Sequence, residues 1–160
     1  RIYHGCCSYS TRVLIAAGAT PRNKKKNYNE FLTIASTGDA QDFGDMTDTR
    51  AAHAALSNQT RGVFMAGFGP SNTNHIDYIT IATPGNSSDF GDLTDARGYQ
   101  ASLSNSVRGL NAGGYDGSTA LNTIDFVIIA TTGNAKEFGD TFSVVYATSG
   151  TSDSHGGLSE

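Results

Sequence analysis

The chain has 160 residues, of which 38% are hydrophobic and 16% are charged, and its formal net charge is −4. This length allows one domain with a core and is short for two. The acidic balance disfavours nucleic acid as a main partner, and no apolar run approaches the length of a membrane-spanning helix.

Three related segments follow one another along the chain and predict its organisation. Arg12, Arg61 and Arg108 each open a segment, at separations of 49 and 47 residues, and the segments read RVLIAAGA, RGVFMAGFG and RGLNAGGYD. Self-similarity at a fixed period is typical of repeat architectures. We therefore expect one repeat domain over residues 1–160. Its units are 12–60, 61–107 and 108–154, with partial units at 1–11 and 155–160.

Each unit is expected to hold four short strands, which predicts an all-β fold. In the middle of the chain the first is the small, apolar stretch 51–57, and the second is 62–68, which ends in a Gly-containing turn. The third is the β-branched stretch 77–83, and the fourth is short and lies near Phe90. A period of about 40 to 50 residues with four strands is typical of a propeller blade.

The string IDYITIATPGNSSDFGDLTDAR, residues 76–97, resembles Kelch-like repeats in proteins of tailed phages, especially marine and cyanobacterial ones. The resemblance covers nearly all of the chain. The segment RGLNAGGYD, with its pair Gly113 and Gly114, is also similar to the Kelch repeat, although the chain has no Trp. The resemblance implies four-stranded β-propeller blades in a virion protein, such as a tail fibre, an appendage or a capsid decoration.

The number of units leaves two interpretations of the fold open. Three blades are fewer than the about four to eight of a closed propeller, so copies would have to assemble or the chain would belong to a longer protein. Three four-stranded units also fit a three-fold β-trefoil or β-prism, which would make the chain a self-contained lectin with three equivalent sugar pockets. Oligomeric mass in solution separates these alternatives.

The function expected from these features is a non-enzymatic structural or adhesion module of a virion, an extracellular particle. Its partners would be further copies of itself or other virion proteins, and also host surface polysaccharide; no nucleic acid, membrane insertion, metal or cofactor is expected. A glycan-acting propeller enzyme is a further alternative. It would need acids, Arg and Tyr that converge on one channel, and near-equal repeats do not supply that asymmetry.

The stretches DFGDMTDTR and DFGDLTDAR begin at Asp42 and Asp89, and EFGDTFSVV from Glu137 is a decayed third copy. Calcium wants about six to eight oxygens, and catalysis needs one site and not three, so the motif is better explained as a structural joint. Phe would hold the last strand to the core, Gly would permit the turn, and the following Asp would cap backbone N–H groups. Recurrent Arg residues would form Asp–Arg pairs between neighbouring strands or units. The joint residues are Phe43, Asp45, Arg50, Phe90, Asp92, Arg97, Phe138 and Asp140.

Binding is expected on the loops between the second and third strands, at 20–29, 69–75 and 116–122, because they vary in length and charge while the frame repeats. The candidate residues in or beside these loops are Tyr28, His75, Tyr115 and Asp116, of which the two tyrosines and the histidine could stack on sugar rings.

Two smaller sequence features carry no catalytic assignment. Cys6 and Cys7 would point to opposite faces of a strand, which predicts two reduced, packed thiols and no disulfide. Ser152, Asp153 and His155 lie close in sequence, but a triad is recognised by geometry, so no catalytic triad is assigned.

Overall fold

A computed structural model describes residues 1–150 of the chain as three four-stranded antiparallel sheets, with no helix in that part. Sheet 1 contains β1 (Gly5–Tyr9), β2 (Arg12–Ala19), β3 (Lys25–Thr33) and β4 (Gln41–Arg50). Sheet 2 contains β5 (Ala54–Ser57), β6 (Arg61–Phe68), β7 (Asn72–Thr80) and β8 (Ser88–Asp92). Sheet 3 contains β9 (Ala101–Ser104), β10 (Arg108–Ala112), β11 (Thr123–Ile128) and β12 (Lys136–Asp140).

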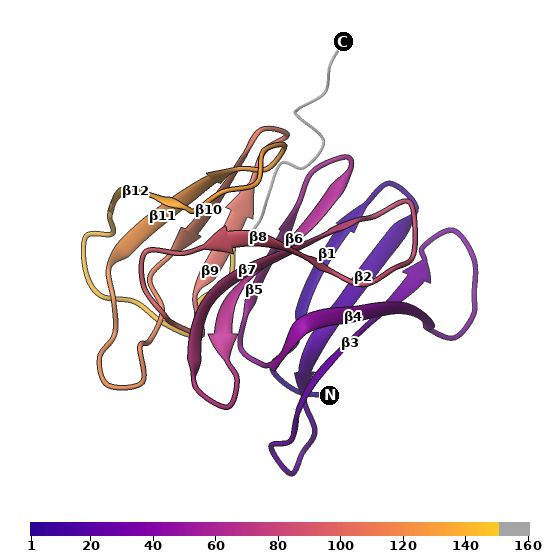
Figure 1. Cartoon of the computed structure of the whole chain (residues 1–160), viewed down its shortest axis with the longest axis horizontal. Helices are drawn as coiled ribbons and strands as arrows, with labels where there is room; N and C mark the ends of the chain where they lie inside the picture. Colours follow the sequence, from indigo (N-terminus) through magenta and orange to yellow (C-terminus); the bar gives the residue numbers. More distant parts are fainter. Residues whose placement is uncertain (151–160) are drawn as a thin grey trace.

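The three sheets follow one another in chain order across Figure 1, from indigo through magenta to orange. Each is a meander in which every strand pairs with the next one along the chain. This confirms the prediction of an all-β chain built from four-stranded units. No helix of the described part is long and apolar enough to cross a membrane.

Each sheet takes its first strand from the segment that precedes the Arg of a sequence unit. The positions Arg12, Arg61 and Arg108 open β2, β6 and β10, so they lie at the hairpin between the first and second strands of a sheet. A sheet therefore begins one strand earlier than the unit read from the sequence. The parts of the last units beyond residue 150 lie outside the described residues.

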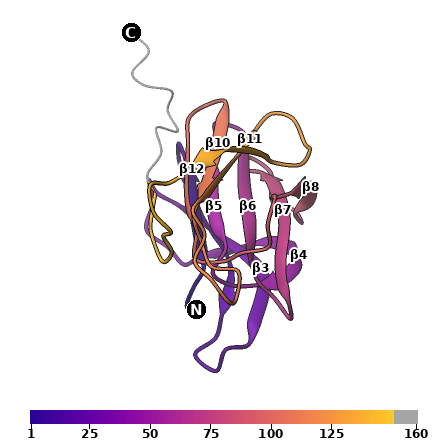
Figure 2. The ribbon, with the colours of Figure 1, turned by 90° about the vertical axis from the view of Figure 1, so that its left-hand side faces the viewer.

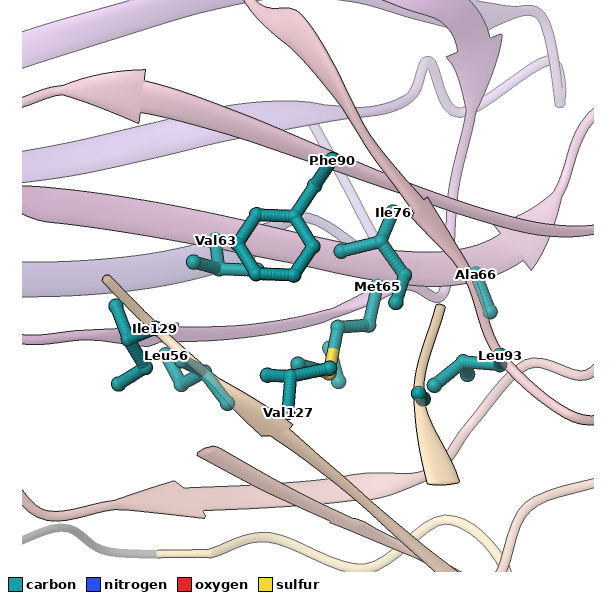
Figure 3. Close-up of a cluster of buried hydrophobic side chains, with 11 residues drawn as sticks. Leu56, Val63, Met65, Ala66, Ile76, Phe90, Leu93, Val127 and Ile129 are labelled. Carbon is teal, nitrogen blue, oxygen red and sulfur yellow. The ribbon is translucent and has the colours of Figure 1, made fainter. Parts of the chain in front are cut away.

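The two hydrophobic cores lie between successive sheets. The first joins Leu14, Phe31 and Phe43 of sheet 1 to residues of sheet 2 such as Ile79. The second joins the opposite face of sheet 2 to sheet 3 and is drawn in Figure 3. Its members are Ala54, Leu56, Val63, Met65, Ala66, Ile76, Phe90, Leu93, Val127, Ile129 and Ala135.

Sheet 2 is covered on both faces, and the pattern of buried residues along its strands reflects this. Six consecutive residues of β6, from 62 to 67, are buried, whereas buried and less buried residues alternate along β10 of sheet 3. A strand with only one covered face keeps the two-residue alternation, and a strand covered on both faces loses it. The sheets are thus stacked in series like propeller blades, and they do not form the closed barrel of a β-trefoil.

Candidate functional site

The Phe-Gly-Asp motif at the end of one sheet is bound to a turn of the next sheet. The Gly85 N–H of sheet 2 donates to the Phe43 carbonyl at 2.6 Å, and the Gly133 N–H of sheet 3 donates to the Phe90 carbonyl at 2.7 Å. Both phenylalanine side chains are 2% exposed. The motif is therefore a joint between sheets at its first two copies.

The aspartate of the motif contributes through its backbone and not through its carboxylate. The Asp45 N–H donates to Asn86 Oδ1 at 2.9 Å, and the Asp92 N–H donates to Asn134 Oδ1 at 3.1 Å. The carboxylates of Asp45, Asp92 and Asp140 make no hydrogen bond or ion pair within residues 1–150. The expected Asp cap is wrong, because the asparagine of the next sheet caps the aspartate's own N–H.

The glycine of the motif is required by the close approach of the two sheets. Gly44 has φ 133°, and a Cβ on it would lie 2.4 Å from the Gly85 carbonyl oxygen. Gly91 has φ 144°, and its Cβ would lie 2.5 Å from the Gly133 carbonyl carbon. Both the backbone conformation and the neighbouring backbone exclude a side chain at this position.

Buried Arg–Asp pairs form a second contact at each joint. Arg50 Nη2 lies 3.0 Å from Asp77 Oδ2, and Thr47 Oγ1 donates to the same carboxylate at 2.8 Å. Arg97 pairs with Asp125 in the next joint, and Thr94 Oγ1 donates to Asp125 at 2.8 Å. The arginines therefore bridge neighbouring sheets as predicted.

The acidic partners of these arginines are not the aspartates of the motif but Asp77 and Asp125 in the third strands. The signal for them was present in the sequence, as an acidic residue before the aromatic residue in NEF, IDY and IDF. Burial lowers the pKa of Arg50, and the nearby Asp77 counteracts this effect. Since an arginine keeps its charge in a protein, the pair is held as a buried ion pair.

Arg1 repeats this arrangement at the first sheet, where it pairs with Glu30. Its Nη1 donates to the Tyr28 carbonyl at 2.9 Å, as Arg97 Nη1 donates to the Thr123 carbonyl at 3.1 Å. The Arg1–Glu30 pair is more exposed than the two pairs between sheets.

The arginines that open each unit also reach the next sheet. Arg12 Nη1 donates to the Ile81 carbonyl at 2.8 Å, and Arg61 Nη1 donates to the Ile129 carbonyl at 2.9 Å. Within the described residues, the only contact recorded for the Arg108 guanidinium is the Phe126 ring, 5.4 Å away. The third copy of the joint is therefore incomplete in the described chain.

A pocket of about 610 Å³ lies at one end of the sheets. In a meander, the loops between second and third strands and the connections from sheet to sheet lie at the same end. These segments from all three sheets line the pocket. Its aromatic residues are Tyr3, Phe68, Tyr99 and Tyr115, and its polar side chains include Asn23, Lys25 and Asn72.

The aromatic rings of this pocket contact one another. The ring centroids of Tyr3 and Tyr99 lie 5.6 Å apart in an edge-to-face arrangement, and those of Phe68 and Tyr99 lie 5.3 Å apart. Burial raises the pKa of Tyr99, so its hydroxyl stays protonated at neutral pH. The pocket presents neutral aromatic surface with a polar rim.

The four predicted binding residues do not converge. Tyr28 lies in β3 with the Arg1 guanidinium 4.6 Å above its ring, and His75 lies in β7 with Nδ1 2.8 Å from Asp48. Both are strand residues, because β3 and β7 begin earlier than expected, so their placement in loops is wrong. Tyr115 lines the pocket, as predicted for a loop site.

Asp116 follows Tyr115 but closes its own turn. Its carboxylate accepts backbone N–H groups from Thr119 and Ser118, and these bonds lower the pKa of Asp116. Sequence reasoning missed Tyr3 and Tyr99, which lie at the entries to sheets 1 and 3. No local pattern marks them as loop residues.

The two cysteines face opposite sides of β1 and are free. Cys7 is buried, which raises its pKa to about 12, whereas Cys6 is exposed, so only one of the two thiols is packed as predicted. Within residues 1–150 no group of three or more His, Cys, Asp or Glu side chains could hold a metal ion. The residues 152–155 lie outside the described residues.

Comparisons with protein-family models and with curated proteins find no match to the chain.

Proposed function

We propose that the chain is a non-enzymatic adhesion module of a phage virion, and that its loop-end pocket binds a neutral oligosaccharide of the host surface. The observation that carries the binding role is the gathering of Tyr3, Tyr99 and Tyr115 from two sheets around one pocket. Pockets that bind small molecules are lined by aromatic side chains with a few polar groups that orient the ligand.

The chemistry of the lining favours a sugar over a charged ligand. An aromatic face packs against the C–H face of a sugar ring, and the amides of Asn23 and Asn72 can donate to and accept from its hydroxyl groups. Lys25 is the one charged side chain in the lining. A single cation is a weak basis for binding a highly anionic polymer.

The distribution of acidic and basic groups supports a binding role over a catalytic one. Glycoside cleavage by acids needs two carboxylates across the substrate. The lining of the pocket contains no carboxylate or imidazole. The repeated Arg50–Asp77 and Arg97–Asp125 pairs are buried between sheets, where they serve the stacking.

The virion assignment rests on the resemblance of residues 76–97 to repeats of tailed-phage proteins. A stack of sheets joined by buried ion pairs and backbone bonds is a rigid frame, and on such frames the loops carry recognition. An adhesion module needs this combination of a constant frame and a variable end.

The test is a glycan array with host polysaccharides, followed by calorimetry on the ligands that bind. We expect Tyr115→Ala to weaken binding at least about tenfold, the loss of one stacking contact and its buried area. Tyr28→Ala is the matched control, because Tyr28 lies outside the pocket, and it should bind as the unchanged protein does. Release of sugar products without stable binding would overturn the proposal in favour of an enzyme.

A further inference from the structure

Each joint between sheets has two halves that differ in their residues. The earlier sheet supplies the Phe-Gly-Asp backbone and an arginine, and the later sheet supplies a turn and a buried isoleucine. The joint between sheets 1 and 2 and the joint between sheets 2 and 3 use the same atoms at equivalent positions. The sequence repeat is therefore also a repeat of one interface.

Within residues 1–150, sheet 3 leaves most of the earlier-sheet half of this interface uncovered, and residues 145–150 pack against part of it. Phe138 is 54% exposed, whereas its equivalents Phe43 and Phe90 are 2% exposed. Leu103 is 37% exposed, whereas its equivalent Leu56 is 3% exposed. Figure 2 views the molecule from the side of sheet 3.

The glycine of the third motif copy also faces open space. A Cβ on Gly139 would meet nothing within 4 Å, whereas those on Gly44 and Gly91 would meet the next sheet. Gly139 keeps the same conformation, with φ 148°. Its backbone is thus already in the form that accepts a partner turn.

Sheet 1 leaves the later-sheet half of the same interface uncovered. Ile34 is 58% exposed, whereas its equivalents Ile81 and Ile129 are 4% and 0% exposed. The turn that contains Gly38 and Asp39 corresponds to the turns that bind Phe43 and Phe90 in the two formed joints. Within residues 1–150 the Gly38 N–H has no hydrogen-bond partner, whereas the Gly85 and Gly133 N–H groups donate to Phe43 and Phe90.

We propose that the uncovered face of sheet 3 binds the uncovered face of sheet 1 in a second copy of this chain. The Gly38 N–H of the second copy would donate to the Phe138 carbonyl, as Gly85 and Gly133 do in the formed joints. The Asp39 carboxylate would accept the Asp140 N–H in place of the asparagine amides.

Other exposed groups on the two faces would also find partners in this association of two copies. Arg108 would donate to the Ile34 carbonyl, as Arg12 donates to Ile81. The apolar side chains Ile34 and Phe138 would bury each other's exposed surface. A second copy supplies every element of the missing half, with the geometry that the chain already uses twice.

Residues 145–150 must move away from sheet 3 when the second copy binds. Ala147 N–H donates to the Tyr99 carbonyl at 2.8 Å, just as Tyr99 N–H donates to the Ala52 carbonyl at 2.9 Å, so these residues occupy the entry position of a following sheet. The second copy fills that position with its own Arg1, which pairs with Glu30. Val145 stands at the equivalent place and offers no charge to Glu30, so the second copy keeps its own segment there.

The association joins unlike faces, and its outcome depends on the rotation between sheets. Such a head-to-tail contact forms a ring if the rotation closes and a filament if it does not. Two copies would give a ring of six sheets, within the about four to eight blades of closed propellers.

The test begins with the mass of the full chain in solution over a range of concentrations. We expect an assembly of two or more copies. The variants Ile34→Lys and Phe138→Lys each destroy one half, so each alone should associate at least about 30-fold more weakly, as expected for loss of a hot-spot residue. Both positions are exposed, so circular dichroism should show folded proteins.

The most decisive part of the experiment is an equimolar mixture of the two variants. Each retains the half that the other lacks, so an equimolar mixture should form a one-to-one complex, and Ser118→Lys, which adds the same charge to an exposed loop, should assemble normally. Hydrogen exchange at Val145 and Ala147 should increase on assembly of the unchanged chain. A chain that stays monomeric, or a single variant that associates as tightly as the unchanged chain, overturns the proposal.

Discussion

Arg50 and Asp77 form a salt bridge of 3.0 Å whose two side chains are 0% and 1% exposed, and they come from different sheets. Thr47 donates to the same carboxylate from its backbone N–H at 3.0 Å and from its hydroxyl at 2.8 Å. A buried charge is tolerated only when it is paired and hydrogen-bonded. This relationship makes the stacking of sheets specific, because any slip would leave both charges unpaired.

Removing one charge of the buried pair should destabilise the stack strongly. For Asp77→Asn we expect the free energy of unfolding to fall by about 3 to 5 kcal/mol, because Arg50 is left buried without its counter-charge. Urea denaturation followed by circular dichroism measures this. Glu30→Gln is the control at the more exposed pair with Arg1, where we expect about 1 kcal/mol or less. Equal losses in the two variants would contradict the role given to burial.

Substitutions at two glycines of the repeated motif distinguish the cost of a steric clash with the next sheet from the cost of backbone strain. Gly91 and Gly139 share nearly the same φ, 144° and 148°, but only Gly91 lies against the next sheet. In the Ile34→Lys background, where no second copy covers Gly139, Gly91→Ala should therefore cost about 1 to 3 kcal/mol more than Gly139→Ala, the usual effect of overpacking. Thermal unfolding of the two variants side by side measures the difference. Similar melting temperatures would show that sheet 3 does not approach Gly91 as described.

Stability should fall as the pH is lowered from about 6.5 toward 3, and His53 is the main cause. His53 is buried beside Arg50, and its pKa is lowered from 6.5 to about 3, with burial as the largest cause. Below pH 6.5 the unfolded chain binds a proton that the folded chain does not, so unfolding is favoured. At pH 5 the loss amounts to about 2 kcal/mol, which urea titrations at several pH values can measure.

The substitution His53→Gln is the control for this pH dependence. Gln100 occupies the equivalent place in sheet 3, so glutamine is compatible with the frame. The variant should show a flatter stability profile between pH 6.5 and 3, with a residual slope from His4, whose pKa is also lowered by burial. An unchanged slope would assign the effect to other groups.

The two cysteines should differ in reactivity with a thiol reagent. Cys6 is exposed, and its thiol should react in the folded protein, although burial of part of the side chain raises its pKa and slows the reaction. Cys7 is buried, its pKa is raised to about 12, and it should react only after unfolding. Absorbance titration should count one thiol in the native protein and two in denaturant. Rapid reaction of both thiols in the native protein would contradict the burial of Cys7.

The joint role of the repeated motif was predictable from the sequence, but its chemistry was not. A phenylalanine between carboxylates in each unit marks a strand that is pinned to a core, and this holds for Phe43 and Phe90. At Phe138 the same letters give an exposed side chain, since burial depends on a following sheet that the described chain does not contain. The shared Phe-Gly-Asp letters are therefore buried at the first two copies and exposed at the third.

The sequence by itself determined the four-stranded units and their order, because alternation and turn chemistry act between near neighbours in the chain. Only the tertiary structure decided that Arg50 meets Asp77, that Tyr3 and Tyr99 join Tyr115 at one pocket, and which faces stay uncovered. Arg50 and Asp77 are 27 positions apart and Tyr3 and Tyr115 are 112 positions apart, and stacking of the sheets brings them together. Which side chains meet between neighbouring sheets depends on how the sheets are stacked. The period of the sequence repeat does not specify that stacking.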